Sequence, residues 1–182
     1  MKQMARPIKM ISPSPALVAV NICDKRWLAK VEDAEARATI AVCAAYGSGA
    51  DEALRRHRGV EVSVLLAGDA DLQRLNNQYC DKDHPTNVLS FSAMTADDLP
   101  ALLGIPLLLG DIAVSYDTAL GEADDENKTL EDHLCHLVVH GMLHLLGFEH
   151  ESEEQAAKME WLEIVVLAEL GVADPYKNAP NE

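Results

Sequence analysis

The chain has 182 residues, of which 48% are hydrophobic, and its formal net charge is −15. This length fits one domain with a single core. No stretch reaches the roughly 20 apolar residues of a membrane span, which excludes an integral membrane protein with helical spans. Four cysteines are scattered without a Cys-x-x-Cys pair, which favours free buried thiols over a disulfide framework.

The charge is unevenly distributed along the chain. Residues 1–60 hold ten Lys and Arg against six Asp and Glu, whereas residues 61–182 hold five against twenty-four. A nucleic-acid surface would therefore use the N-terminal third. The candidate cations there are Lys25, Arg26, Arg55, Arg56 and Arg58. A solvated charged face explains them equally well, and the total charge predicts weak non-specific RNA binding.

The first half of the chain predicts an irregular arm, then two strands that alternate with two helices. The arm covers residues 1–15, and the first strand, 17–22, runs into a charged Asp-Lys-Arg sequence, so it is not a signal peptide and we expect a cytoplasmic protein. An alanine-rich helix over 32–56, with a break near its glycines, is followed by a strand at 60–66. Asp69 is expected to cap the next helix.

The second half predicts two strands and then two helices. The strands cover 88–91 and 111–115, joined by a long apolar connection. Thr129-x-x-Asp132 opens a histidine-rich helix, and the capping box Ser152-x-x-Gln155 opens the last helix, which Gly171 ends.

These elements predict an α+β fold. Because no helix separates the strands 88–91 and 111–115, they should be antiparallel neighbours. We expect a mixed sheet of about four strands with the histidine-rich helix packed centrally on one face. The domain would span residues 16–174, followed by a tail at 175–182.

Three histidines near the end of that helix predict a metal site. His140 and His144 are four residues apart and share a helix face, and Gly147 can end the helix so that His150 turns back to them. Three neutral imidazoles leave the fourth position of a tetrahedral zinc open, which is typical of a catalytic zinc. The spacing H-x3-H-x2-G-x2-H also matches metzincin proteases, but their catalytic Glu is replaced here by Gly141, which argues against a peptidase.

The histidine sequence resembles the signature of the YbeY family, bacterial metal-dependent endoribonucleases of ribosomal RNA maturation. The block from Leu75 to Phe91 resembles the family's Leu-Asn…Pro-Thr-(Asp/Asn)-Val-Leu-Ser-Phe element, and the block from Leu109 to Ser115 resembles its Leu-Gly-Asp-Ile strand. The resemblance covers roughly residues 60 to 170. It implies that His140, His144 and His150 bind one zinc ion per chain.

Two departures from the family bear on its activity. The family usually has an Arg, thought to serve RNA binding or catalysis, where this chain has Cys80, and a thiol offers no permanent positive charge. Either Arg74 or Lys82 replaces it, or the nuclease is weakened; Arg55 and Arg56 are further candidates for substrate binding. The other departure is Glu149 in place of the more usual Asp.

Two further residues are candidates for catalysis. Glu149 could orient the attacking water or accept its proton, or hold a ligand histidine by a hydrogen bond. His136 lies one turn before the first ligand and could support the site or contact phosphate. Asp111 could face the site, but it could equally be a turn residue.

The resulting hypothesis is zinc-assisted cleavage of single-stranded RNA, in which the metal lowers the pKa of bound water to about 7. The attacking group would be that water or the substrate's 2′-hydroxyl. The resemblance implies a role at the 3′ end of small-subunit ribosomal RNA and in ribosome quality control, with ribosomal partners and no DNA substrate. The alternatives are a zinc-stabilised ribosome-assembly factor with little catalysis and a metalloprotease-like hydrolase.

Overall fold

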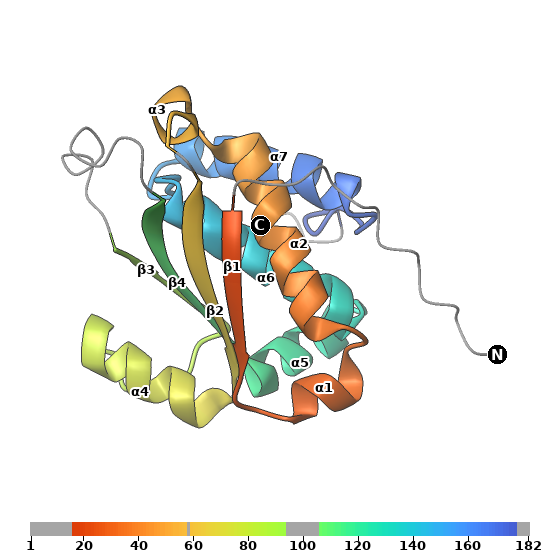
Figure 1. Cartoon of the computed structure of the whole chain (residues 1–182). Coiled ribbons are helices and arrows are strands. Elements are labelled where there is room, and N and C mark those ends of the chain that lie inside the picture. Colours follow the sequence, from red (N-terminus) through yellow and green to blue (C-terminus); the bar gives the residue numbers. More distant parts are fainter. Residues whose placement is uncertain (1–15, 58, 94–105, 178–182) are drawn as a thin grey trace.

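The computed structural model describes residues 16–57, 59–93 and 106–177. Its four strands form one sheet, and helices lie on both faces of that sheet (Figure 1). In chain order they are β1 (Ala16–Ile22), α1 (Arg26–Lys30), α2 (Ala34–Gly49), α3 (Glu52–Arg55), β2 (Val60–Ala67), α4 (Asp69–Cys80), β3 (Val88–Ser92), β4 (Leu107–Ser115), α5 (Tyr116–Asp125), α6 (Leu130–Leu145) and α7 (Glu153–Glu169).

The sheet is mixed, with strand order β1-β2-β4-β3. β1 and β4 both lie parallel to β2, whereas β3 lies antiparallel to β4 with Ser90 opposite Ile112. The predicted α+β fold, the four-stranded mixed sheet and the antiparallel pair are confirmed. β4 begins at Leu107, earlier than expected, and the middle of the apolar connection, residues 94–105, lies outside the described residues.

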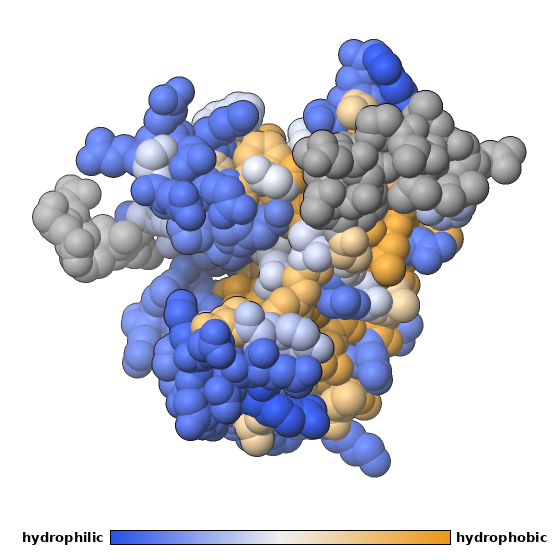
Figure 2. Space-filling view, turned by 90° about the vertical axis from the view of Figure 1, so that its left-hand side faces the viewer, coloured by the Kyte–Doolittle hydropathy of each residue, from blue (hydrophilic) through white to orange (hydrophobic). Residues whose placement is uncertain are grey.

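The main core lies between the sheet and the helices α2 and α6, and α7 packs on these two helices. Alternate β1 residues from Ala16 to Ile22 pack toward this core, so Leu17 points to the other face, where it is 63% exposed. That other face is partly covered by α4, through a small cluster that includes Leu72 and Ala113. Hydrophobic residues also reach the surface in Figure 2, between hydrophilic areas above and below. α6, which carries the histidines, is thus fixed on the most buried side of the sheet.

Two local predictions need correction. The sequence reading missed α5, which follows β4 without a break, and the short α1. The break expected near the glycines of the long helix is present, because α2 ends at Gly49 and Asp51 then adopts an extended conformation and accepts a hydrogen bond from the backbone N–H of Leu54 at the start of α3. Asp69 does not cap α4, because its carboxylate accepts hydrogen bonds from Ser115 and Thr118 and so ties α4 to α5.

The cysteines agree in part with expectation. None of the four forms a disulfide bond, and burial raises the pKa of the Cys135 thiol to about 11. Cys23 and Cys80 are exposed rather than buried. Among the described residues, no helix is both long and apolar enough to cross a membrane.

Candidate metal centre

α6 begins and ends as its sequence predicts. The Thr129 hydroxyl accepts a hydrogen bond from the backbone N–H of Asp132 at the start of the helix. At the other end Gly147 has a φ of 86°, and the backbone N–H groups of Gly147 and Phe148 donate to the carbonyls of His144 and Leu143. This pair of bonds is a Schellman motif, which reverses the chain direction after the helix. The reversal brings His150 back to the helix end.

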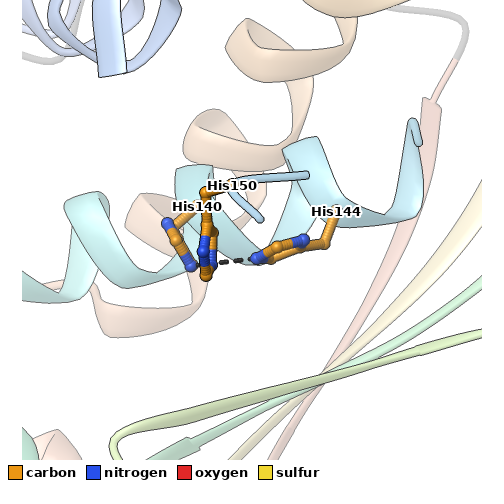
Figure 3. Close-up of side chains that lie close together, drawn as sticks. All are labelled: His140, His144 and His150. Atoms are coloured by element: carbon orange, nitrogen blue, oxygen red, sulfur yellow. Dashed lines mark hydrogen bonds between the residues drawn. The ribbon is translucent and has the colours of Figure 1, made fainter. Parts of the chain in front are cut away.

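The three predicted ligands converge. The ligating atoms offered by His140, His144 and His150 all lie within 4.8 Å of one another. The Nε2 atoms of His140 and His144 are 3.1 Å apart, and the His150 ring lies 5.1 Å from that of His144, centroid to centroid. Figure 3 shows two of the rings coming from α6 and the third from the following loop. The two helical histidines are partly buried and His150 is exposed, so the site is open to solvent on one side.

This arrangement fits a zinc ion. Tetrahedral zinc with Zn–N bonds of about 2.0–2.1 Å separates its nitrogen ligands by about 3.3–3.4 Å, close to the distance between the two Nε2 atoms. The cluster also lies at the C-terminal end of α6, where the helix dipole favours a cation. Burial, together with the neighbouring His140, lowers the pKa of His144, so the imidazole is held in the neutral form that a metal requires.

Gly141 explains why this site lacks the metzincin base. A Cβ atom at this position would lie 2.9 Å from Ile112 Cγ2 and 2.9 Å from Ser90 Oγ, which are side chains of the sheet. The Ser90 hydroxyl in turn donates to the Gly141 carbonyl. The residue after the first histidine therefore packs against the sheet, and no side chain there could act as a base at the metal.

Two residues missed by the sequence reading lie behind the three histidines. Glu163 of α7 is fully buried, and its Oε1 accepts a hydrogen bond from His140 Nδ1 at 2.7 Å. The Tyr176 hydroxyl donates to Oε2. Burial alone would raise the pKa of Glu163, but these hydrogen bonds from His140 and Tyr176 lower it. The available signal was a carboxylate four residues after Met159, on the stripe that forms the core face of α7.

His136 is a largely buried neighbour of this network. Its side chain is 16% exposed, its Nε2 lies 3.9 Å from Glu163 Oε2, and its ring makes an edge contact with Tyr176. His133, one turn earlier on α6, is buried, and its Nε2 lies 2.8 Å from a carboxylate oxygen of Glu122.

His136 should make stability depend on pH. Burial lowers its pKa to about 4, below the ordinary 6.5, so the unfolded chain binds more protons between these values. Stability from this group is therefore present above pH 6.5 and is lost as the pH falls toward 4. Between pH 7 and pH 5 we expect the free energy of unfolding to fall by about 2 kcal/mol more in the wild-type protein than in His136→Phe. Urea unfolding of both chelated proteins at the two pH values would measure it, and equal losses would contradict the assignment.

The candidate substrate-binding residues are dispersed, and most are engaged. Arg74 pairs with Asp71 on the surface of α4, and Arg56 pairs with Glu52. The Arg55 guanidinium donates to the carbonyls of Ala50 and Gly47 and so closes the end of α2. Of the remaining candidates, Lys25 and Lys82 are exposed, Arg26 pairs with Asp24 and Asp117, and Arg58 lies outside the described residues. Cys80, at the position of the family's usual Arg, is also exposed.

The two candidate carboxylates have different positions. Glu149 lies beside the histidine cluster, with Oε2 3.6 Å from His144 Nδ1, a separation too long for a hydrogen bond. Its side chain is 53% exposed and so accessible to a substrate. Asp111 does not face the site, because its neighbour Ile112 packs against α6 at Gly141 and adjacent strand residues point to opposite faces.

Comparison with known proteins agrees with this geometry. A protein-family model described as "Endoribonuclease YbeY" matches residues 21–171. A curated protein of that name from Paramagnetospirillum magneticum is 48% identical over 160 residues, covering 87% of this chain and 94% of its own. A second, from Rhodospirillum rubrum, is 44% identical and covers 91% of this chain and 84% of its own.

The fold also matches a solved structure. The solution structure of TM1509 from Thermotoga maritima superposes with a TM-score of 0.51 over 91% of this chain and 99% of that chain, at 24% sequence identity. That likeness shows the fold alone. The family model and the curated relatives, which cover most of the chain, establish that this protein belongs to the YbeY family.

Proposed function

We propose that this protein is a zinc-dependent endoribonuclease that cleaves single-stranded RNA during ribosomal RNA maturation, at the 3′ end of the small-subunit RNA and in ribosome quality control. The observation that supports it best is the convergence of His140, His144 and His150 in a chain whose relatives are named endoribonucleases. Three imidazole ligands leave one position for a substrate or water. A zinc ion there would polarise a phosphoryl oxygen and activate a water molecule.

The residues of the chain have separate roles in this proposal. Glu149, exposed beside His144, accepts a proton from the attacking group. His136 supports the site from behind, because it is buried against Glu163. Arg74, Lys82, Arg55 and Arg56 are the proposed phosphate contacts; the first and the last would have to exchange an exposed carboxylate partner for the phosphate. Such exposed pairs are weak, so the exchange costs little.

The test is cleavage of end-labelled single-stranded RNA by the zinc-loaded protein. We expect cleavage that disappears with a chelator and returns when zinc is restored, with zinc alone as the control for metal-catalysed hydrolysis. Ends carrying 2′,3′-cyclic phosphate would identify the substrate's 2′-hydroxyl as the attacking group, and 5′-phosphate ends paired with 3′-hydroxyl ends would identify water. Intact RNA in the presence of bound zinc would contradict the nuclease.

A zinc-stabilised ribosome-assembly factor is the second candidate. It is favoured by the net charge of −15 and by Cys80, which cannot provide the charge of the family's usual Arg. Zinc binding and ribosomal association without RNA cleavage would support it. A peptidase is disfavoured, since Gly141 packs against the sheet.

Cys80→Arg should increase RNA cleavage about tenfold, the value of one added charge-assisted phosphate contact. The matched control is Cys23→Arg, which adds the same charge at another exposed cysteine. Initial rates of cleavage of one RNA at fixed ionic strength would compare them. Equal rates for Cys80→Arg and wild type would show that Arg74 or Lys82 meets the phosphate instead.

A further inference from the structure

Glu163 is an unusual residue for the centre of a core. It lies on α7 among Met159, Leu162 and Val166, and its side chain is only 1% exposed. A carboxylate at such a position costs several kcal/mol unless it is hydrogen-bonded on both oxygens. An apolar residue would fill the same space without that cost. The carboxylate therefore needs a function beyond packing.

Both of its oxygens have a donor. Oε1 accepts from His140 Nδ1 at 2.7 Å, and Oε2 accepts from the Tyr176 hydroxyl. Because Nδ1 carries the donated proton, the lone pair of His140 is on Nε2. Nε2 is the atom that approaches His144 Nε2 to 3.1 Å, on the side where the three rings converge. The carboxylate thus fixes both the tautomer and the direction of the ligand.

Tyr176 is itself held in place by the segment after α7. Its backbone N–H donates to the Asp174 carboxylate, and the preceding carbonyl, of Pro175, accepts from Lys128 Nζ at 3.2 Å. Its ring also makes an edge contact with His136 on α6. The segment from Asp174 to Lys177 is therefore anchored both near the start of α6 and at the carboxylate behind the metal ligands.

From these contacts, we infer that Glu163 and Tyr176 are positioning residues of the metal centre, which act on the metal through His140. This inference rests on the proposed function, since it takes the three histidines as zinc ligands. It assigns the C-terminal segment a part in metal binding although none of its residues reaches the metal. Removing an outer hydrogen bond of this kind typically weakens metal binding by about 10- to 100-fold.

The experiment measures zinc affinity by competition with a chromophoric chelator for wild type, Glu163→Gln and Tyr176→Phe. We expect the affinity to fall about 10- to 100-fold for Glu163→Gln and by a smaller factor, up to about 10-fold, for Tyr176→Phe. The absorption of bound Co²⁺ should keep a tetrahedral pattern in both, with a shifted maximum, because all three ligands remain. Tyr46→Phe is the matched control, since its hydroxyl bonds the Leu54 carbonyl in the core and should leave affinity unchanged.

Thermal unfolding of the chelated proteins separates positioning from simple destabilisation. The inference is supported if a variant of Glu163 or Tyr176 loses more zinc affinity than Tyr46→Phe does while its metal-free form is as stable as that of Tyr46→Phe. Wild-type affinity and an unshifted Co²⁺ spectrum in Tyr176→Phe and Glu163→Gln would overturn it, and if Glu163→Gln does not fold, Tyr176→Phe decides alone. A wild-type protein that binds zinc without cleaving RNA would refute the nuclease while leaving this comparison valid. Absence of zinc binding by wild type would overturn both.

Discussion

His144→Ala is expected to abolish zinc binding and to reduce RNA cleavage by more than about 100-fold. This histidine supplies one of the three candidate ligand atoms that lie within 4.8 Å of one another among the described residues, so its loss leaves two. Loss of a direct ligand must exceed the effect of losing an outer hydrogen bond, which is about 10- to 100-fold in affinity. Zinc content of the purified protein and initial cleavage rates would measure the two losses.

The same variant should also lose the stabilisation that zinc gives. A ligand that binds only the folded state at 100 times its Kd stabilises that state by about 2.7 kcal/mol. Wild type should therefore unfold at a higher temperature with zinc than with a chelator, whereas His144→Ala should show no difference. The control is His84→Ala, which removes an exposed imidazole outside the cluster and should keep one zinc per chain. Retention of zinc and cleavage by His144→Ala would refute the three-histidine site.

The histidine cluster could be predicted because its geometry is local. Residues four apart on a helix share a face, and a glycine after the last turn signals a reversal, so the positions of His140 and His144 follow from spacing alone. The φ of 86° at Gly147 and the two hydrogen bonds after the helix are the expected motif. The antiparallel pairing of β3 with β4 could be predicted for a similar reason, because no helix separates the two strands in the sequence.

The support behind the ligands could not be predicted, because it depends on contacts between distant segments. Glu163 is 23 residues from His140, and the sequence does not tell how α7 is rotated on α6. Asp69 shows the same limit. Aspartate is a residue type that often caps helices, but here its carboxylate accepts a hydrogen bond from the Thr118 hydroxyl of α5, a helix that the sequence reading missed. At Asp69, tertiary hydrogen bonds overrode the local preference.

Gly110→Ala is expected to destabilise the protein by on the order of 3 kcal/mol. Gly110 has a φ of 147°, and a Cβ atom there would lie 2.1 Å from the backbone oxygen of Phe91 on the neighbouring strand. The strain of that conformation costs about 1–3 kcal/mol and overpacking costs a similar amount. Since the obstructing atom belongs to the backbone of β3, a rotamer change cannot relieve it. In a chain of this length the loss corresponds to a Tm lower by roughly 6–12 °C.

Gly47→Ala is the matched control, because Gly47 lies inside α2 and a Cβ there has nothing within 4 Å. Alanine is favoured over glycine within a helix by about 1 kcal/mol, so this variant should be slightly more stable than wild type. Urea unfolding of the chelated proteins measures the two effects without a contribution from zinc.

β3 also carries Ser90, whose hydroxyl donates to the Gly141 carbonyl of α6, so strain between β3 and β4 should reach the histidine cluster. Gly110→Ala should therefore also bind zinc more weakly, and a variant as stable as wild type would show that β3 can move away from β4 without cost.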